Sequence, residues 1–169
     1  LVNEILDFSG PYKPNWAKAE IKELIEESVE EMVLTIDSSS IELKKELPED
    51  ELSSWIDIVR FKSIVKNLIS NSIQAIETKG KISISVTTNV GDVVQIKVSD
   101  NGQGIPESDL KKVFDPFFTT KTMGTGLGMC IVKKIIDMHG GNIDIQSEVG
   151  KGTAVTINLP IHRECPQSS

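Results

Sequence analysis

The spacing of apolar residues divides the chain into helical and extended segments. Apolar positions three or four residues apart predict amphipathic helices at 17–33, 60–77 and 127–139. Alternation of apolar and polar residues predicts strands at 41–47, 55–59, 82–86, 94–98, 142–147 and 153–159. Because the alternating strands are apolar on one face only, the pattern predicts an α+β fold, a two-layer α/β sandwich in which helices cover one face of a mixed sheet.

Glycine and proline residues mark the ends of several segments. Residues 1–9 have helical spacing and look like the last turns of a longer helix, which a Gly-Pro pair and Pro14 would end. Gly80 is expected to cap the helix at 60–77. The stretch 112–125 has no clear period and is expected to be a mobile loop, and the residues from Pro160 onward are expected to form a polar tail.

The composition narrows the function classes. The chain has 169 residues, enough for one domain with a real core, and a formal net charge of −7. An acidic surface repels phosphate backbones, so general nucleic-acid binding is not expected. Cys130 and Cys165 form no metal-ligand spacing, and His139 and His162 are expected to be structural or surface residues. The first residue is Leu1, so we expect a piece of a larger protein.

The first candidate for chemistry is the segment that begins at Asp100. This aspartate ends a predicted strand and is followed by Gly102, Gly104 and Ile105. Two glycines let the backbone approach a flat ligand without a side-chain collision. The carboxylate can accept a hydrogen bond from an exocyclic amine, which would select adenine over guanine. The alternative is a simple Asp-Asn-Gly turn.

A second glycine-rich segment, Gly124-Thr125-Gly126-Leu127-Gly128, opens the last predicted helix. The unpaired amides and the dipole at a helix start favour phosphate oxygens. The segment is not a Walker motif, because no Gly-Lys-Ser/Thr follows, and it does not follow a strand as a dinucleotide fingerprint would. Alone, a glycine triplet does not establish phosphate binding.

Two asparagines lie on one face of the helix predicted at 60–77. Asn67 and Asn71 are four residues apart, so their side chains point the same way. Carboxamide oxygens suit Mg²⁺, which keeps several waters and takes phosphate oxygens, so one protein ligand is enough. The alternative is a pair of polar residues at the flank of an apolar stripe.

The stretch between the glycine-rich segments contains an aromatic cluster. Phe114, Phe117 and Phe118 either pack in the core or belong to a loop that docks its apolar side reversibly. Lys121, just beyond them, could reach a terminal phosphate or could simply be solvated.

In order and spacing, these segments resemble the N, G1, F and G2 boxes of sensor histidine kinases. The boxes would be 67–75, 100–104, 114–118 and 124–128, and the match covers roughly 17–160. The turn that ends at Thr153 resembles the glycine-threonine turn near the end of the same domain. The resemblance implies a Bergerat ATP-binding fold of the GHKL superfamily, with a mixed sheet under three helices and ATP beneath a flexible lid.

The resemblance also implies a role for each matched residue. Asn71 would hold Mg²⁺ against the phosphates, and Asn67 would support that site from one turn earlier. Together with Lys121, an extrapolation within the lid, they form the expected catalytic set. The implied residues for binding ATP are Asn67, Asn71, Asp100, Gly102, Gly104, Ile105, Lys121, Thr125, Gly126, Leu127, Gly128 and Thr153. One departure from the family pattern is that Gln74 and Ala75 stand where many members carry a basic residue or tyrosine.

The phosphate acceptor of such kinases is a histidine on a preceding dimerisation helix, which this chain lacks. The resemblance therefore implies three parts: the end of that helix and a linker at 1–14, the catalytic domain at 15–161 and a tail at 162–169. The expected cofactors are ATP and Mg²⁺. The expected partners are the protein's own dimerisation/histidine phosphotransfer domain and the receiver domain of a response regulator, with no contact to nucleic acid or membrane. We expect a cytoplasmic domain that is monomeric alone and belongs to a homodimeric parent.

Two alternatives use the same fold differently. An ATPase of the gyrase, mismatch-repair or chaperone type usually places an acidic residue in the N box to activate water, where this chain has Asn67. A serine kinase or regulatory module, such as a relative of the anti-sigma kinases, would lack the short helical segment at 1–9.

Overall fold

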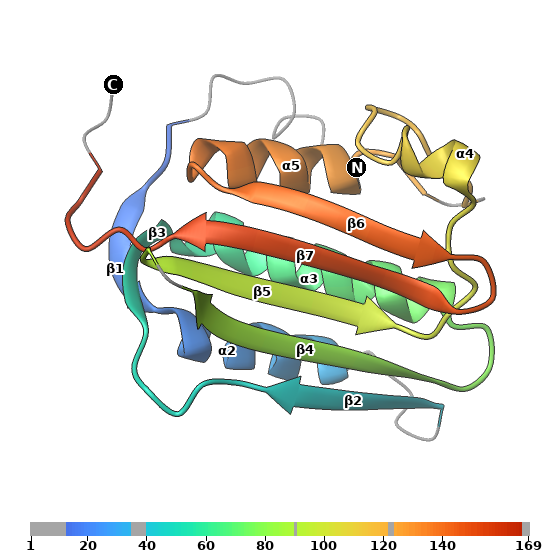
Figure 1. Cartoon of the computed structure of the whole chain (residues 1–169), viewed down its shortest axis with the longest axis horizontal. Helices are drawn as coiled ribbons and strands as arrows, with labels where there is room; N and C mark the ends of the chain where they lie inside the picture. Colours follow the sequence, from blue (N-terminus) through green and yellow to red (C-terminus); the bar gives the residue numbers. More distant parts are fainter. Residues whose placement is uncertain (1–12, 35–39, 90, 122–123, 167–169) are drawn as a thin grey trace.

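Two layers make up the part of the chain that the computed structural model describes, residues 13–34, 40–89, 91–121 and 124–166. One layer is a five-stranded sheet, and the other contains three helices on one of its faces (Figure 1). The strands, in their spatial order, are β2 (Ile41–Glu46), β4 (Gly80–Asn89), β5 (Val93–Asp100), β7 (Gly152–Pro160) and β6 (Asn142–Glu148). Only the β2–β4 pair is parallel, so the sheet is mixed and mostly antiparallel, which confirms the predicted α+β class.

The helices α2 (Ile21–Val33), α3 (Ile58–Ala75) and α5 (Gly128–Met138) follow the predicted apolar stripes. The single-turn α4 (Glu107–Leu110) has no buried residue. Figure 1 shows α2, α3 and α5 behind the sheet. A two-stranded antiparallel ribbon, β1 (Trp16–Glu20) and β3 (Ser53–Asp57), lies at one end of the molecule.

The core lies between the helices and one face of the sheet. Inward-facing residues of the three central strands are buried: Ile82, Ile84, Val86, Val94, Ile96, Val98, Val155, Ile157 and Leu159. The opposite face carries polar pairs across the strands. Ser83 Oγ lies 2.8 Å from Ser99 Oγ, and Gln95 donates to Asn158 at 2.9 Å. The period-two alternation therefore separates a packed face from a polar face.

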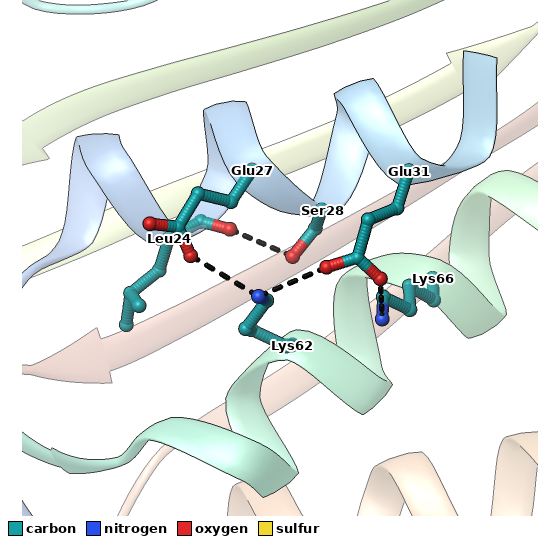
Figure 2. Close-up of polar contacts among 6 residues, drawn as sticks. All are labelled: Leu24, Glu27, Ser28, Glu31, Lys62 and Lys66. Atoms are coloured by element: carbon teal, nitrogen blue, oxygen red, sulfur yellow. Dashed lines mark hydrogen bonds and ion pairs between the residues drawn. The ribbon is translucent and has the colours of Figure 1, made fainter. Parts of the chain in front are cut away.

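Charged side chains close the outer edge of the α2–α3 contact (Figure 2). Lys62 on α3 contacts Glu27 at 3.1 Å and Glu31 at 3.0 Å, and Lys66 also pairs with Glu31. The hydrogen bond from Lys66, followed by that from Lys62, lowers the pKa of the Glu31 carboxyl. Both carboxylates are more than half exposed, so these pairs align the two helices more than they stabilise them.

A buried histidine joins the ribbon to the helical layer. His139 follows α5 and is 3% exposed. Its Nε2 accepts a hydrogen bond from the Asp57 amide at 3.1 Å, and its Nδ1 lies 2.8 Å from the Ile135 carbonyl oxygen. Its ring packs edge-on against Trp16, which also contacts His162. One imidazole thus links segments 82 residues apart in the sequence.

Several predicted boundaries are wrong. Residues 17–20 belong to strand β1 instead of a helix, because they pair with β3, and the helix begins at Ile21. The strand predicted at 55–59 is β3, whose last residue caps α3: the Asp57 carboxylate accepts from the Arg60 amide at 3.1 Å. Helix α3 ends at Ala75, so Gly80 is the first residue of β4 and not a helix cap.

The C-terminal segment is only partly a tail. Strand β7 includes Pro160, and His162 pairs with the ribbon: its carbonyl accepts from the Trp55 amide at 2.9 Å and its amide donates to Ser54 Oγ at 2.9 Å. These contacts place the chain up to His162 on the folded body. The helical segment predicted at 1–9 lies outside the described residues.

Candidate functional site

A cavity of about 350 Å³ lies between the C-terminal half of α3, the end of β5 and the start of α5. Loop residues before and after α4 complete its wall. Among the predicted binding residues, those that line it are Asn67, Asn71, Asp100, Gly104, Ile105, Lys121, Thr125, Gly126, Gly128 and Thr153. Residues from four separate segments of the sequence therefore converge on one space.

Two predicted binding residues do not line the cavity. Leu127 is 2% exposed and packs in the core. Gly102 belongs to the loop after β5 and lies against the end of α3, where an added Cβ would be 2.4 Å from the Ala75 carbonyl oxygen. That carbonyl, at the end of α3, accepts a hydrogen bond from the Gln103 amide at 2.9 Å. Glycine at 102 thus lets the loop cross the helix end, a packing reason distinct from close approach to a ligand.

The two asparagines of α3 have different surroundings. Asn71 donates through Nδ2 to the Met129 sulfur at 3.3 Å, which orients its Oδ1. A Cβ at Gly128 would lie 2.5 Å from the Asn67 Oδ1, so glycine lets the first turn of α5 pass directly over Asn67. Asn67 therefore lies against the first turn of α5, and Asn71 offers an oriented oxygen to the cavity.

Lys121 provides a cation in the cavity. Its Nζ donates to Asn71 Oδ1 at 2.9 Å and to Gln74 Oε1 at 2.7 Å. Gln74 is itself held by a hydrogen bond to Ser70 Oγ at 3.0 Å. Burial lowers the pKa of the Lys121 ammonium, and the Asp100 carboxylate partly opposes that shift. The ammonium therefore occupies the same carboxamide oxygen for which the sequence predicts Mg²⁺.

Asp100 is fixed by backbone amides. One carboxylate oxygen, Oδ1, accepts from the Gly102 amide at 2.9 Å and from the Thr153 amide at 3.3 Å. Within the described ranges, no hydrogen bond engages Oδ2. Because Asp100 lines the cavity, that second oxygen is available to a donor on a ligand.

The start of α5 offers backbone donors to the cavity. No side chain caps this helix, and both Gly128 and Met129 in its first turn line the cavity. The four N–H groups at a helix start have no partner within the helix. Together with the positive end of the helix dipole, they form a site suited to an anion.

The three phenylalanines separate in the structure. Phe118 lines the cavity, Phe114 is half-buried, and Phe117 is 66% exposed with φ of 66°. A Cβ at Gly126 would lie 2.4 Å from the Phe117 carbonyl carbon, so the loop passes close to the glycine-rich turn. Only one phenylalanine of the cluster therefore contributes to the cavity wall.

Sequence reasoning missed several residues of the site. Met129 holds Asn71, Gln74 holds Lys121, and Ser147 contacts the predicted residue Thr153. Gln74 stood out only as a departure from a family pattern. Ser147 carries no local signal of its contact with Ile105, which lies 42 residues earlier in the chain.

No helix in the described ranges is both long and apolar enough to span a membrane.

Comparison with known proteins gives one consistent result. A family model described as "Histidine kinase-, DNA gyrase B-, and HSP90-like ATPase" matches residues 56–163. The signal transduction histidine-protein kinase AtoS of Escherichia coli (strain K12) is 33% identical over 168 residues, which are 99% of this chain and 28% of AtoS. The chain thus spans less than a third of that curated relative.

Solved structures agree with the sequence matches. The nucleotide-free catalytic domain of histidine kinase ThkA superimposes with a TM-score of 0.78 at 34% identity, over 88% of this chain and 97% of that domain. Histidine kinase ThkA in complex with response regulator protein TrrA gives a TM-score of 0.80 at 32% identity, over 95% of this chain and 46% of that one.

Proposed function

The chain belongs to the family of histidine kinase-, DNA gyrase B- and HSP90-like ATPases, and from this premise we propose that it positions Mg-ATP for phosphorylation of a histidine. Its fold is the α+β Bergerat fold of histidine kinase catalytic domains. The acceptor would lie on the dimerisation domain of a parent sensor kinase, and an aspartate of a response regulator would then receive the phosphoryl group. The names of AtoS and of the ThkA–TrrA complex support these partners.

This proposal rests on hydrogen-bond donors and acceptors that line the same cavity. Asp100 offers an acceptor to the cavity, and the uncapped start of α5 and the Lys121 ammonium offer donors to it. A ligand that satisfies both kinds of group presents an amine and an anion. Adenine joined to a triphosphate has this arrangement.

The adenine end would be bound by Asp100 and its neighbours. We assign the amino group of the base to the second carboxylate oxygen of Asp100, since the first already accepts two amides. Gly104, Ile105 and Thr153 line the same part of the cavity and would contact the ring.

The phosphate end would be bound by backbone amides of the α5 start. Gly126 and Gly128 line this region, with Thr125 beside them. Lys121 would add a cation to the terminal phosphate once its Nζ leaves Asn71. Positioning and charge neutralisation are the main contributions that a protein makes to phosphoryl transfer.

The residues present also fit Mg²⁺. Asn71 Oδ1 is oriented by the Met129 contact and already holds a cation, the Lys121 ammonium. A carboxamide oxygen plus phosphate oxygens and water is a normal donor set for Mg²⁺. When bound, the ion would neutralise charge that develops on the phosphate oxygens. Asn67 would act by positioning α5 over the metal ligand.

The reaction breaks the bond between the γ-phosphorus and the bridging oxygen, forms a bond to the acceptor imidazole nitrogen, and releases ADP. The imidazole proton would pass to a base beside that histidine, outside this chain. We propose the corresponding division into a linker at 1–14 and a catalytic domain from 15, with the tail expected at 162–169 beginning only after His162, whose backbone pairs with the ribbon. Use of ATP places the proposed reaction in the cytoplasm.

Phosphotransfer in trans tests the proposal. The chain is mixed with the dimerisation domain of its own parent protein and with γ-labelled ATP. We expect label on that domain that is acid-labile and base-stable, as for phosphohistidine. An otherwise identical reaction with the acceptor histidine replaced by glutamine is the control and should remain unlabelled. Steady phosphate release without label on the domain would contradict the kinase proposal and indicate an ATPase.

A further inference from the structure

A serine outside the cavity contacts one of the residues that line it. Ser147 lies on β6, directly opposite Thr153 on β7. Its Oγ is within hydrogen-bond distance of three groups: the Ile105 amide nitrogen at 2.8 Å, the Gly152 carbonyl oxygen at 2.9 Å and Thr153 Oγ1 at 2.8 Å. Ser147 therefore joins the loop after Asp100 to the strand that carries Thr153.

Counting hydrogens decides the direction of each bond. A serine hydroxyl has one hydrogen to donate and two lone pairs. The Ile105 amide can only donate and the Gly152 carbonyl can only accept, so the Ser147 hydrogen goes to Gly152. Thr153 must then donate its own hydrogen to Ser147. The reverse order would place two oxygens 2.9 Å apart with no hydrogen between them.

The consequence for Thr153 is a fixed polarity. Its only hydroxyl hydrogen is committed to Ser147, so toward the cavity the hydroxyl can only accept. The Asp100 carboxylate beside it is also an acceptor, held by the Thr153 amide. This end of the cavity thus presents acceptors from two side chains.

From this arrangement we propose that Ser147 is a positioning residue for base selectivity, because it makes the Thr153 hydroxyl an acceptor and so favours a 6-aminopurine over a 6-oxopurine. The inference rests on the proposed binding of ATP in this cavity. The amino group of adenine can donate to acceptors. The oxygen at the same position of hypoxanthine is itself an acceptor and would face them without a hydrogen.

Removal of the Ser147 hydroxyl should free the Thr153 hydroxyl hydrogen to point in another direction. In Ser147→Ala, the Thr153 hydroxyl can turn its hydrogen toward a ligand and donate to the oxygen of a 6-oxopurine. We measure the dissociation constants of ADP and inosine diphosphate with Mg²⁺ by calorimetry. We expect the preference for ADP to fall roughly fivefold, the usual size of one neutral hydrogen bond.

A second variant tests the route through Thr153. Thr153→Val keeps the shape of the side chain and removes the hydroxyl, so it too should reduce the preference for ADP. In the Thr153→Val background, Ser147→Ala should change the preference no further, because the proposed selectivity acts through the Thr153 hydroxyl. An additional loss in the double variant would overturn the inference.

Ser83→Ala is the matched control. It removes a hydroxyl from a cross-strand pair with the same 2.8 Å separation, on the polar face of the sheet. Its ratio of affinities should equal that of the parent chain. Thermal unfolding of each variant separates a loss of fold from a loss of selectivity, and Thr153→Val still decides the question if Ser147→Ala unfolds.

The outcomes separate the two proposals. If the parent chain binds neither diphosphate, the proposed function fails. If it binds ADP but does not prefer it to inosine diphosphate, or if Ser147→Ala or Thr153→Val leaves the preference unchanged, the proposed function stands and the role of Ser147 is wrong.

Discussion

Helix α3 has two sides whose polar side chains have different partners. On the side of α2, Lys62 and Lys66 pair with Glu27 and Glu31 of the same chain (Figure 2). On the side of α5, Asn71 faces a cavity, and the cation on its oxygen comes from a loop. The first arrangement is complete within the fold, and in the second the proposed function requires Lys121 to give up the Asn71 oxygen to Mg²⁺.

This difference suggests that one helix separates stability from ligand binding. Its buried residues pack against the sheet and α2, while its C-terminal half presents Asn67 and Asn71 to the cavity. Substitutions in the packed part should lower the free energy of unfolding, and substitutions at the cavity should lower ligand affinity.

Phe61→Ala should give the largest loss of stability. Phe61 is 1% exposed in the core, and its truncation should cost about 3–5 kcal/mol of unfolding free energy through lost burial and a residual cavity. Chemical denaturation measures the loss, and ADP affinity measured where the variant is folded should stay near that of the parent. A loss below about 1 kcal/mol would show that α3 contributes less to the core than its burial indicates.

Asp100→Asn should act on binding instead. The asparagine oxygen can accept the amides of Gly102 and Thr153 as the carboxylate does, so its nitrogen would replace the acceptor that faces the ligand. We expect a loss of about 1–3 kcal/mol in ADP affinity, measured by calorimetry, with a smaller change in stability. Unchanged ADP affinity would remove Asp100 from the binding site.

His139 should make stability depend on pH. Burial lowers its pKa from the usual 6.5; the hydrogen bond to the Ile135 carbonyl and the Asp57 charge oppose that shift, and the neighbouring His162 adds to it. Below pH 6.5 the unfolded chain takes up a proton that the folded imidazole resists, so stability should fall as the pH drops from about 6.5 and level off only below the folded-state pKa.

Unfolding by denaturant at a series of pH values measures this effect. The His139→Gln variant is the control, because it cannot take up that proton and should lose this part of the slope. The comparison covers pH 7 to 5, a range of about two units around the pKa of a free imidazole. If the free energy of unfolding depends on pH equally in the parent chain and in the variant, His139 is not the source of that dependence.

Lys62→Ala should have the smallest effect. Its two glutamate partners are more than half exposed, and exposed ion pairs contribute little to stability. We expect a change in unfolding free energy close to the error of denaturation experiments, and no change in ADP affinity. A weaker affinity for ADP would show that the α2 side influences the cavity.

Local patterns in the sequence predicted much of this molecule. Helix α5 and the strands of the sheet follow from apolar periodicity, because burial on one face imposes it. The residues around the cavity were found because short-range motifs such as 67–71 and 100–104 keep their spacing within single elements. The structure then brings these separate motifs together.

The features that sequence reasoning missed depend on contacts between distant segments. Strand β1 was merged into a helix, because its pairing partner β3 comes more than thirty residues later along the chain. His139 gave no signal of its bond to Asp57, and Ser147 gave none of its bond to Ile105. No local pattern encodes such contacts.

The direct test of the exchange at Asn71 is the effect of Mg²⁺ on nucleotide affinity. Calorimetry would compare ATP binding with and without Mg²⁺ for the parent chain and for Asn71→Ala. If the carboxamide oxygen passes from Lys121 to the metal, Mg²⁺ should strengthen binding to the parent, and most of that gain should disappear in the variant. An equal gain in both proteins would contradict a metal role for Asn71.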